Sequence, residues 1–326
     1  MEDSSNTELN LEVLADECGI KDCSDENAVI KSFLALEDNY TQENLVKIYN
    51  YFLAVANNPK VLSELVRCID KIRNRESLPV LIDVLLMKTS PQDETSKEDY
   101  ENVRVLCAKA IANLKDTTAV HALLYCLNNK NENYKVRFAC ADALGKIGDR
   151  FAVTPLIDVM QDENEKSLYI KESAASALGM LGDARAIDPL VSILETKNGL
   201  LNKFTFLKER VLEALGKLKI GDNQRVFDAV RKSLVDESPQ IRINAIEVLM
   251  NSDDSRAGEL IKKMLFDSNA EVVQNAVIAL YNLFEDEILE VIINDSQMPD
   301  VAKTAAINLK EDIPEEEEGE EGEDNE

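Results

Sequence analysis

Apolar residues along this chain recur in a helical pattern that repeats about every 34 residues. The passages ADALGKIGDRFAVTPLIDVM, from Ala141, and ASALGMLGDARAIDPLVSIL, from Ala175, are near-copies of each other. The last apolar residue of the A-x-A-L-G string has counterparts along most of the chain, at Ile69, Ile111, Leu144, Leu178, Leu215, Leu249, Leu280 and Leu309. A period of this length is typical of helical repeat proteins.

A second apolar position lies twelve residues after five of these anchors, at Leu123, Leu156, Leu190, Phe227 and Ile261. Each period therefore predicts two amphipathic helices joined by a short turn. One such hairpin cannot bury its own apolar face, so successive pairs must stack around a continuous core. The pattern predicts an all-α protein, a right-handed α-solenoid (superhelix) of about seven to eight helix pairs.

Charge divides the chain into a head, a body and a tail. Residues 1–27 carry nine acidic residues and one lysine, and residues 310–326 carry eleven acidic residues and one lysine. Few apolar residues accompany these charges, so we expect a mostly disordered acidic head over 1–27 and a disordered acidic tail over 310–326. Two amphipathic helices within 28–60 are predicted to cap the N-terminal end of the solenoid, which spans 61–309.

Targeting signals are not evident in the sequence. Residues 1–27 are acidic and no apolar run approaches 18 residues, so neither a signal peptide nor a membrane span is predicted. We expect a cytoplasmic protein that does not bind a membrane.

A basic residue recurs near the start of each second helix, at Arg104, Arg137, Lys171, Lys208 and Arg242. A phosphate-binding ladder is one interpretation of this series. Nucleic-acid affinity depends on neutralising a polyanion, however, and this chain has a net charge of −26. We therefore expect no nucleic-acid partner.

The strings VRFACADALGKIGD, from Val136, and IKESAASALGMLGD, from Ile170, resemble the HEAT-like repeats first associated with phycobilisome lyases. The resemblance is close over residues 101–195 and extends to about Leu283. It implies that the first helix of each pair lies on the outer face and the second helix lines the concave face. It also implies that each basic residue of the series above pairs with an aspartate in the preceding loop, for which Asp162 and Asp236 are available. Members of this family include chromophore lyases, scaffolds, an iron-dependent hydroxylase and relatives of DNA glycosylases, so the fold alone does not determine function.

Catalytic chemistry has few candidate residues. The single histidine, His121, cannot form a histidine cluster, and neither a G-x-S-x-G string nor a P-loop is present. Cys68, Cys107, Cys126 and Cys140 fall in slots that face the core and are interpreted as small buried hydrophobes. A metal or redox role for Cys18 and Cys23, spaced C-x4-C, stays open beside the interpretation that they have none. We expect no catalytic residue, metal or cofactor.

The remaining candidate is a protein-binding surface on the second helices. Two slots in each of these helices are predicted to face the groove, and they hold a mixture of acidic and apolar residues. This mixture suits a basic or amphipathic helical segment of another protein, although a charged stripe that is simply a solvated helix face remains the alternative. The candidate residues are Phe138, Asp142, Glu172, Glu209, Glu213, Ile243 and Glu247.

Two periods are longer than the others. The first is extended within the polar stretch KTSPQDETSKEDYEN, from Lys88, which predicts a loop. The second contains the apolar residues Leu200, Leu201 and Phe204, which are interpreted either as a contact with a partner or as internal packing. In the packing interpretation, Phe206 and Leu207, which follow, begin the next second helix and pack inward.

Two functions are compatible with these observations. The first is a non-catalytic scaffold or adaptor that holds a protein partner on its concave face. The second is a phycobilisome-lyase-like factor that helps attach a bilin to a phycobiliprotein or remove it, and only the repeat resemblance supports it.

Overall fold

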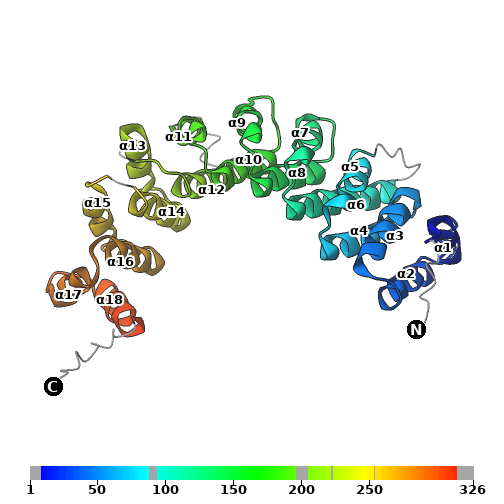
Figure 1. The fold of residues 1–326 in the computed structure, drawn as a ribbon. Coiled ribbons are helices and arrows are strands. Elements are labelled where there is room, and N and C mark those ends of the chain that lie inside the picture. Colours follow the sequence, from blue (N-terminus) through cyan, green and yellow to red (C-terminus); the bar gives the residue numbers. More distant parts are fainter. Residues whose placement is uncertain (1–8, 88–93, 196–204, 222, 253, 314–326) are drawn as a thin grey trace, which may run out of the picture. The chain divides into compact units, whose positions relative to one another are not determined.

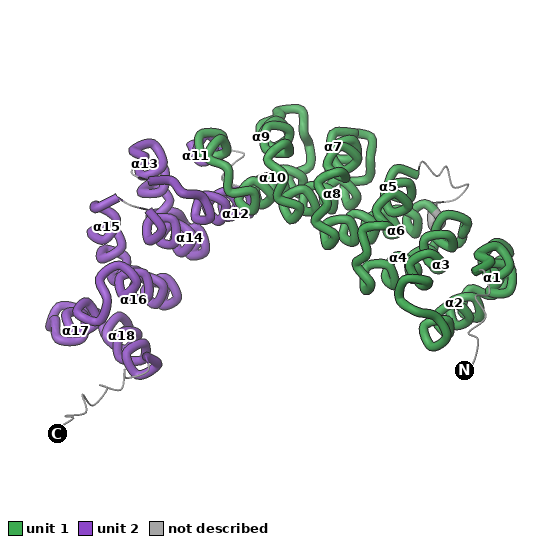
Figure 2. The backbone as a smooth tube through the Cα atoms, viewed as in Figure 1, with its two compact units in different colours: residues 1–189 green, residues 190–326 purple. Residues whose placement is uncertain are grey.

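The computed structural model describes residues 9–87, 94–195, 205–221, 223–252 and 254–313. These residues form 18 α-helices and five short 3-10 helices, and no strand occurs among them. The chain divides into two compact units, residues 1–189 and 190–326 (Figure 2). The helices are labelled in Figure 1. The predicted α-solenoid is confirmed, because each unit is a stack of helix pairs.

Unit 1 is built from pairs in which a first helix covers a second helix. The second helices α4, α6, α8 and α10 pack successively against one another, and the first helices α3, α5, α7 and α9 each cover the second helix of their own pair. The bounds are α3 Gln42–Val55, α4 Pro59–Ile72, α5 Leu78–Leu86, α6 Glu94–Leu114, α7 Val120–Asn128, α8 Tyr134–Ile147, α9 Val153–Gln161 and α10 Leu168–Leu181.

Unit 2 repeats this arrangement. The second helices α12, α14, α16 and α18 pack successively, and α13, α15 and α17 cover α14, α16 and α18. Helix α11, Ile187–Glu195, contains the boundary between the units. The other bounds are α12 Thr205–Gly216, α13 Gln224–Ser233, α14 Pro239–Met250, α15 Ala257–Met264, α16 Ala270–Phe284, α17 Asp286–Asn294 and α18 Asp300–Asp312.

The G-D dipeptide that ends each copy of the repeat motif explains the turn between successive pairs. Gly148 and Gly182 end α8 and α10 with φ of +82° and +65°, a left-handed conformation that glycine adopts without steric cost. The following aspartates, Asp149 and Asp183, each accept a hydrogen bond from the backbone two residues on. This bond starts a 3-10 turn, η4 (Arg150–Ala152) or η5 (Ala184–Ala186), that leads into the next first helix.

The predicted anchors form the core of the stack. Seven of the eight, from Ile69 to Leu280, are at most 1% exposed. The five apolar residues that lie twelve positions after an anchor, from Leu123 to Ile261, are also buried. The eighth anchor, Leu309, is only half-buried. It lies in α18, and no further pair covers it among the described residues.

The acidic head is more ordered than its composition predicts. Residues 11–17 form helix α1 (Leu11–Glu17) and residues 26–34 form α2 (Glu26–Leu34), which pack on α3 and α4 respectively. Ile20 and Phe33 are fully buried between these helices and the rest of unit 1. The expectation of a mostly disordered head is therefore wrong for residues 9–27. A few well-spaced apolar residues are enough to add one more pair, whereas residues 1–8 lie outside the described part.

The long periods also differ from the predictions. Most of the predicted loop from Lys88 is helical, because α6 starts at Glu94, while residues 88–93 lie outside the described residues. In α12, Leu207 packs inward as predicted but Phe206 is 68% exposed. Leu200, Leu201 and Phe204 lie outside the described residues, as does the tail from residue 314.

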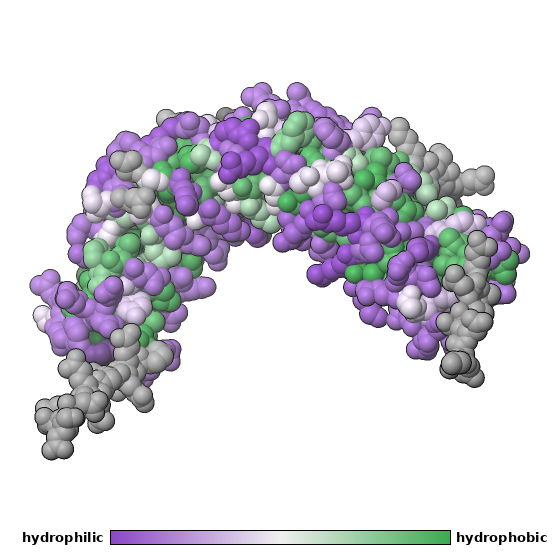
Figure 3. Space-filling model, in the orientation of Figure 1, coloured by the Kyte–Doolittle hydropathy of each residue, from purple (hydrophilic) through white to green (hydrophobic). Residues whose placement is uncertain are grey.

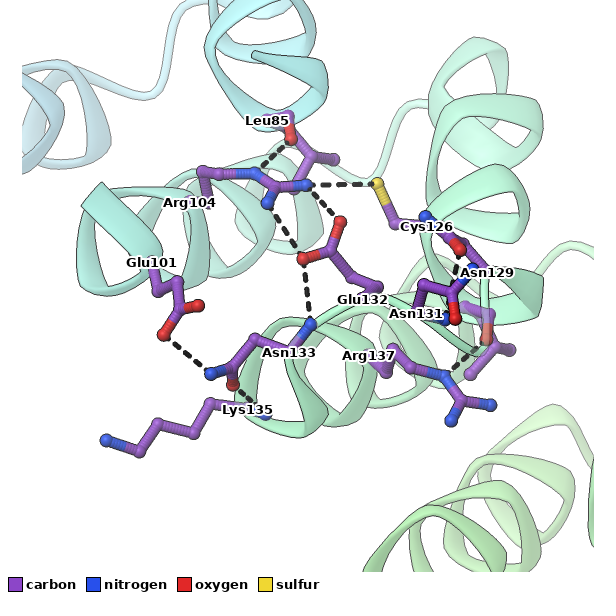
Figure 4. A network of polar contacts seen from close by, with 11 residues as sticks. Leu85, Glu101, Arg104, Cys126, Asn129, Asn131, Glu132, Asn133, Lys135 and Arg137 are labelled. Carbon is purple, nitrogen blue, oxygen red and sulfur yellow. Dashed lines mark hydrogen bonds and ion pairs between the residues drawn. The ribbon is translucent and has the colours of Figure 1, made fainter. Parts of the chain in front are cut away.

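Buried ion pairs connect successive helix pairs. In α6, Arg104 donates through Nε to the carbonyl of Leu85 at 2.7 Å and holds Glu132 with two further bonds of 2.8 and 2.6 Å (Figure 4). Arg137, one repeat later, donates to the carbonyl of Leu127 at 2.8 Å and to Glu165 at 2.5 Å. Each guanidinium thus satisfies a carbonyl at the end of its own first helix and a carboxylate of the next pair.

The same connection occurs in unit 2, where Lys208 pairs with Asp236 at 3.0 Å and Arg242 with Asp267 at 2.8 Å. The acidic partner lies in the following loop, 25 to 28 residues after the basic residue, and not in the preceding loop as predicted. Arg137 shows the reason. Its Nε donates to the carbonyl of Leu127, in its own first helix, and this bond directs its NH2 group toward Glu165 of the next pair. Asp162, named as a candidate partner, instead pairs with Lys130.

Candidate protein-binding site

The second helices of unit 1 enclose a cavity that includes two of the predicted residues. Phe138 and Asp142 both lie on α8 and line a space of about 350 Å³ between α6, α8 and α10. Their spacing of four residues places them on one face of the helix. The complete lining is Asn102, Val105, Lys109, Tyr134, Lys135, Phe138, Ala139, Asp142 and Tyr169.

Three exposed aromatic side chains surround this cavity. Tyr134 is 50% exposed, Phe138 45% and Tyr169 64%. The rings of Tyr134 and Tyr169, from successive second helices, have centroids 6.2 Å apart and planes inclined by 32°. The space-filling view shows apolar surface interleaved with hydrophilic side chains over the helices of unit 1 (Figure 3). Exposed aromatic groups concentrated around one hollow are typical of binding surfaces.

A second cavity of about 550 Å³ adjoins the first on α6. Asn102, Val105 and Lys109 line both cavities, so the two form one groove along the second helices. We call it the unit 1 groove. The second cavity is otherwise lined by Ile30 of α2, by residues of α4 and by other residues of α6, namely Pro59, Lys60, Ser63, Glu64, Arg67, Asp99 and Leu106.

Ion pairs neutralise most of the charge in this groove. Arg67 pairs with Glu64 at 2.7 Å and Asp142 with Lys146 at 2.8 Å. Lys135 of α8 pairs with Glu98 of α6 at 2.9 Å, and Lys60 pairs with Glu26. Lys109 makes no ion pair with any residue in the described part of the chain.

These pairs change the predicted electrostatics. The sequence prediction counted Asp142 toward an acidic groove, but Lys146 neutralises it one helical turn away. The unit 1 groove also has lysines and an arginine along its length. Glu172, the remaining unit 1 candidate, is half-buried on α10 and does not line either cavity.

The other predicted residues lie in unit 2. Glu209 and Glu213 are on α12, and Ile243 and Glu247 are on α14, which packs against it. Burial raises the pKa of the Glu209 carboxyl above its ordinary value. Glu213 pairs with Arg210 at 2.6 Å, whereas Glu247 is exposed.

The four thiols that were predicted to face the core are buried, and the histidine lies on the surface. Cys68, Cys107, Cys126 and Cys140 are all buried, as predicted from their slots. Burial raises the pKa of Cys68 to about 11. In the part that the structure describes, no three histidine, cysteine or acidic side chains are grouped so that they could hold a metal ion. His121 is exposed and its ring lies 5.0 Å from that of Phe151.

Comparison with protein families identifies the repeat. The family model described as HEAT repeats matches residues 92–168 and 202–281, and the PBS lyase HEAT-like repeat matches residues 170–196. Together these matches cover more than half of the chain. The chain is a HEAT-repeat protein. No curated protein matches it in sequence.

Comparison with solved structures finds similar proteins. A karyopherin, Kap121p, bound to the extreme C-terminus of the protein phosphatase Cdc14p is similar with a TM-score of 0.52 and 12% identity, over 92% of this chain and 37% of that one. The CpcE and CpcF complex of phycocyanin lyase from Nostoc matches with a TM-score of 0.46 and 23% identity, over 72% and 93% of the two chains. A designed armadillo repeat protein matches with a TM-score of 0.43 and 19% identity, over 63% and 99%.

The sequence reasoning missed the two tyrosines beside Phe138. Tyr134 precedes Phe138 by four residues, and Tyr169 follows Tyr134 by 35, close to the period of the HEAT repeat. Both spacings were a usable signal, because they place three aromatic groups on the same face of two successive second helices.

The described residues include no helix long and apolar enough to cross a membrane.

Proposed function

We propose that this HEAT-repeat chain is a non-catalytic scaffold that binds a protein partner on the exposed face of its second helices. The observation that carries the proposal is the cavity in unit 1 with Tyr134, Phe138 and Tyr169 around it. A solvated helix face has no need of three half-exposed aromatic side chains. Buried aromatic residues contribute much of the energy at protein interfaces.

The partner chemistry in unit 2 is proposed from charge. Glu209 and Glu247 present carboxylates on neighbouring second helices, with the half-buried Ile243 between them in sequence. A basic or amphipathic helical segment of a partner would complement this mixture. The karyopherin with its bound phosphatase C-terminus has a similar fold and supports the proposal only at that level.

Site-specific crosslinking tests the proposal in the cells that make the protein. Phe138, on the second helix α8, is replaced with the photo-crosslinking amino acid p-benzoylphenylalanine. In a matched control, Phe151 is replaced with the same amino acid. Phe151 is 58% exposed but lies in η4, at the start of a first helix. We expect a discrete protein adduct from position 138 and none from 151. Equal labelling at both positions, or none, would contradict the assignment of the surface.

Charge reversal tests the partner chemistry in unit 2. Glu209→Lys combined with Glu247→Lys is expected to slow association with a basic partner and to reduce the salt dependence of binding. The matched control combines Glu259→Lys with Glu287→Lys, on the first helices α15 and α17. It is expected to leave the association rate and the salt dependence of binding unchanged. Affinity that is insensitive to the first pair of substitutions and to salt would place the site elsewhere.

Bilin handling is the competing hypothesis. The match at residues 170–196 concerns a repeat pattern that carries the name of phycobilisome lyases. The purified protein is mixed with free bilin and its visible absorption spectrum is recorded. The scaffold proposal expects no shift of the bilin band, and a saturable shift would favour the lyase-like function.

A further inference from the structure

The unit 1 groove has an apolar end and a charged centre. At the apolar end, Tyr134, Phe138 and Tyr169 leave large parts of their rings in contact with solvent. The cavity among them, about 350 Å³, falls in the size range of sites that hold small ligands or single bulky side chains. Filling it with an apolar side chain would remove aromatic surface from water, which is the dominant favourable contribution in most associations.

The charged centre of the groove has one cation without a partner among the described residues. Lys109 lines both cavities and is exposed. Glu26, and more weakly Asp99, raise the pKa of Lys60, so that lysine already faces two carboxylates. The cations Arg67 and Lys135 are likewise paired with Glu64 and Glu98.

The acidic side chains of the groove leave Lys109 uncompensated. Asp142 lines the same cavity as Lys109 but bonds Lys146 at 2.8 Å, and Glu64 bonds Arg67. Asp99, which lies ten residues before Lys109 on α6, acts on Lys60 and makes no ion pair with Lys109 among the described residues. Lys109 is therefore the position at which a carboxylate from outside would gain an ion pair without breaking one within the part of the chain that the structure describes.

We propose that the unit 1 groove binds an acidic amphipathic segment of the partner protein. A bulky apolar side chain of this segment occupies the cavity among Tyr134, Phe138 and Tyr169, and a neighbouring Asp or Glu pairs with Lys109. The inference rests on the proposed scaffold function and gives unit 1 a specificity of opposite sign to that proposed for the acidic residues of unit 2.

A random twelve-residue peptide library displayed on phage tests this specificity with the full-length protein. We expect the selected peptides to combine Leu, Phe or Trp with Asp or Glu. Binding of a selected peptide should weaken at least tenfold in Phe138→Ala and several-fold in Lys109→Ala, with the effect of Lys109→Ala diminishing at high salt. Tyr125→Ala, which removes a 55% exposed aromatic ring from the first helix α7, is the matched control and leaves affinity unchanged.

A second variant keeps the test decisive. When the same library is selected for binding to the Lys109→Glu variant, peptides with Lys or Arg in place of the acidic residues should be enriched. Circular dichroism checks that each variant is folded. Selected peptides that are basic with the wild type, that are insensitive to Phe138→Ala, or that fail to emerge at all would overturn the inference. If a protein still crosslinks from position 138 in that case, the scaffold function stands and only the acidic specificity fails.

Discussion

The pair formed by Arg137 and Glu165 is the most buried of the ion pairs that connect the repeats. Their side chains are 5% and 6% exposed, and the guanidinium also satisfies the carbonyl of Leu127. Removing one partner of such a pair leaves the other charge without compensation in a poorly solvated position. The energetic importance of Arg137 therefore lies more in what its loss would expose than in the attraction itself.

Arg137→Met is expected to lower the free energy of unfolding by about 3 kcal/mol, measured by denaturant titration. Arg67→Met, which removes the exposed pair with Glu64, is the control and should cost at most about 0.5 kcal/mol. The double variant Arg137→Met with Glu165→Leu should regain much of the loss, because no unpaired charge remains. Equal effects of the two single substitutions would contradict this account of the pair.

The same pair predicts how stability depends on pH. Burial raises the pKa of Glu165, but the hydrogen bonds from Arg137 and from the backbone of Ser167 lower it by more than burial raises it. The pKa of Glu165 is therefore below its ordinary value. A lowered pKa contributes stability that is fully present above the ordinary value of about 4.3 and is lost as the pH falls further. Between pH 7 and about 3.5, the wild type should lose more stability than the Arg137→Met, Glu165→Leu variant. Parallel pH profiles would exclude the contribution of Glu165.

At the scale of helices, close approach is set by the glycine of the A-L-G string. A Cβ atom added to Gly145 in α8 would lie 2.8 Å from the Cα of Ala177 in α10, closer than carbon atoms pack. The equivalent Gly216 in α12 has no neighbour nearer than 3.8 Å. Identical motifs therefore have different constraints in the two units.

Gly145→Ala is expected to destabilise the protein by about 1–3 kcal/mol, since the backbone of α10 would have to move. Gly216→Ala should change stability by less than about 1 kcal/mol, because helix propensity favours alanine and the space is open. Thermal unfolding of the two variants, compared with the wild type, makes the measurement. A Gly145→Ala variant as stable as Gly216→Ala would show that α8 and α10 adjust without cost.

The sequence predicted the elements better than it predicted their contacts. The burial of the anchors from Ile69 to Leu280 could be predicted because the 34-residue pattern of apolar residues indicates which face of each helix is apolar. The clash that forbids a side chain at Gly145 depends on the distance between two helices, which the pattern does not record. Pairing of Arg104 with Glu132 was missed for the same reason, since the direction of a guanidinium is decided by which carbonyl it reaches.

The candidate site was predicted in part. Phe138 and Asp142 share a cavity, but the neutralisation of Asp142 by Lys146 and the participation of Tyr134 follow from side-chain packing. The charge of a groove depends on which ion pairs close within the chain, and a count of acidic slots does not include these pairs.

At the scale of the whole molecule, the two ends of the chain are expected to differ in importance. Helices α1 and α2 pack on α3 and α4 and bury Ile20 and Phe33. A chain that starts at residue 41 would lack these side chains and expose to water the apolar surface of α3 and α4 that they cover. Truncation after Ile313 removes the acidic tail but none of the described helices.

The N-terminal deletion is therefore expected to lower the melting temperature and to promote self-association, measured by calorimetry and size-exclusion chromatography. The tail truncation should leave the melting temperature within about 1–2 °C of the wild type and reduce solubility. A fully stable, monomeric N-terminal deletion would show that α1 and α2 are dispensable for the stack.

The equal separation of the two buried arginine–glutamate pairs in unit 1 has a consequence for how such a chain can change in length. Arg104 and Arg137 each hold a carboxylate 28 residues later, and the two arginines are 33 residues apart. If a genetic deletion removed residues 105–137, Glu165 would then follow Arg104 at the same distance of 28 residues. Loss or gain of one full period thus restores an equivalent pair at the new junction, so repeat number can vary during evolution without leaving a buried charge unpaired.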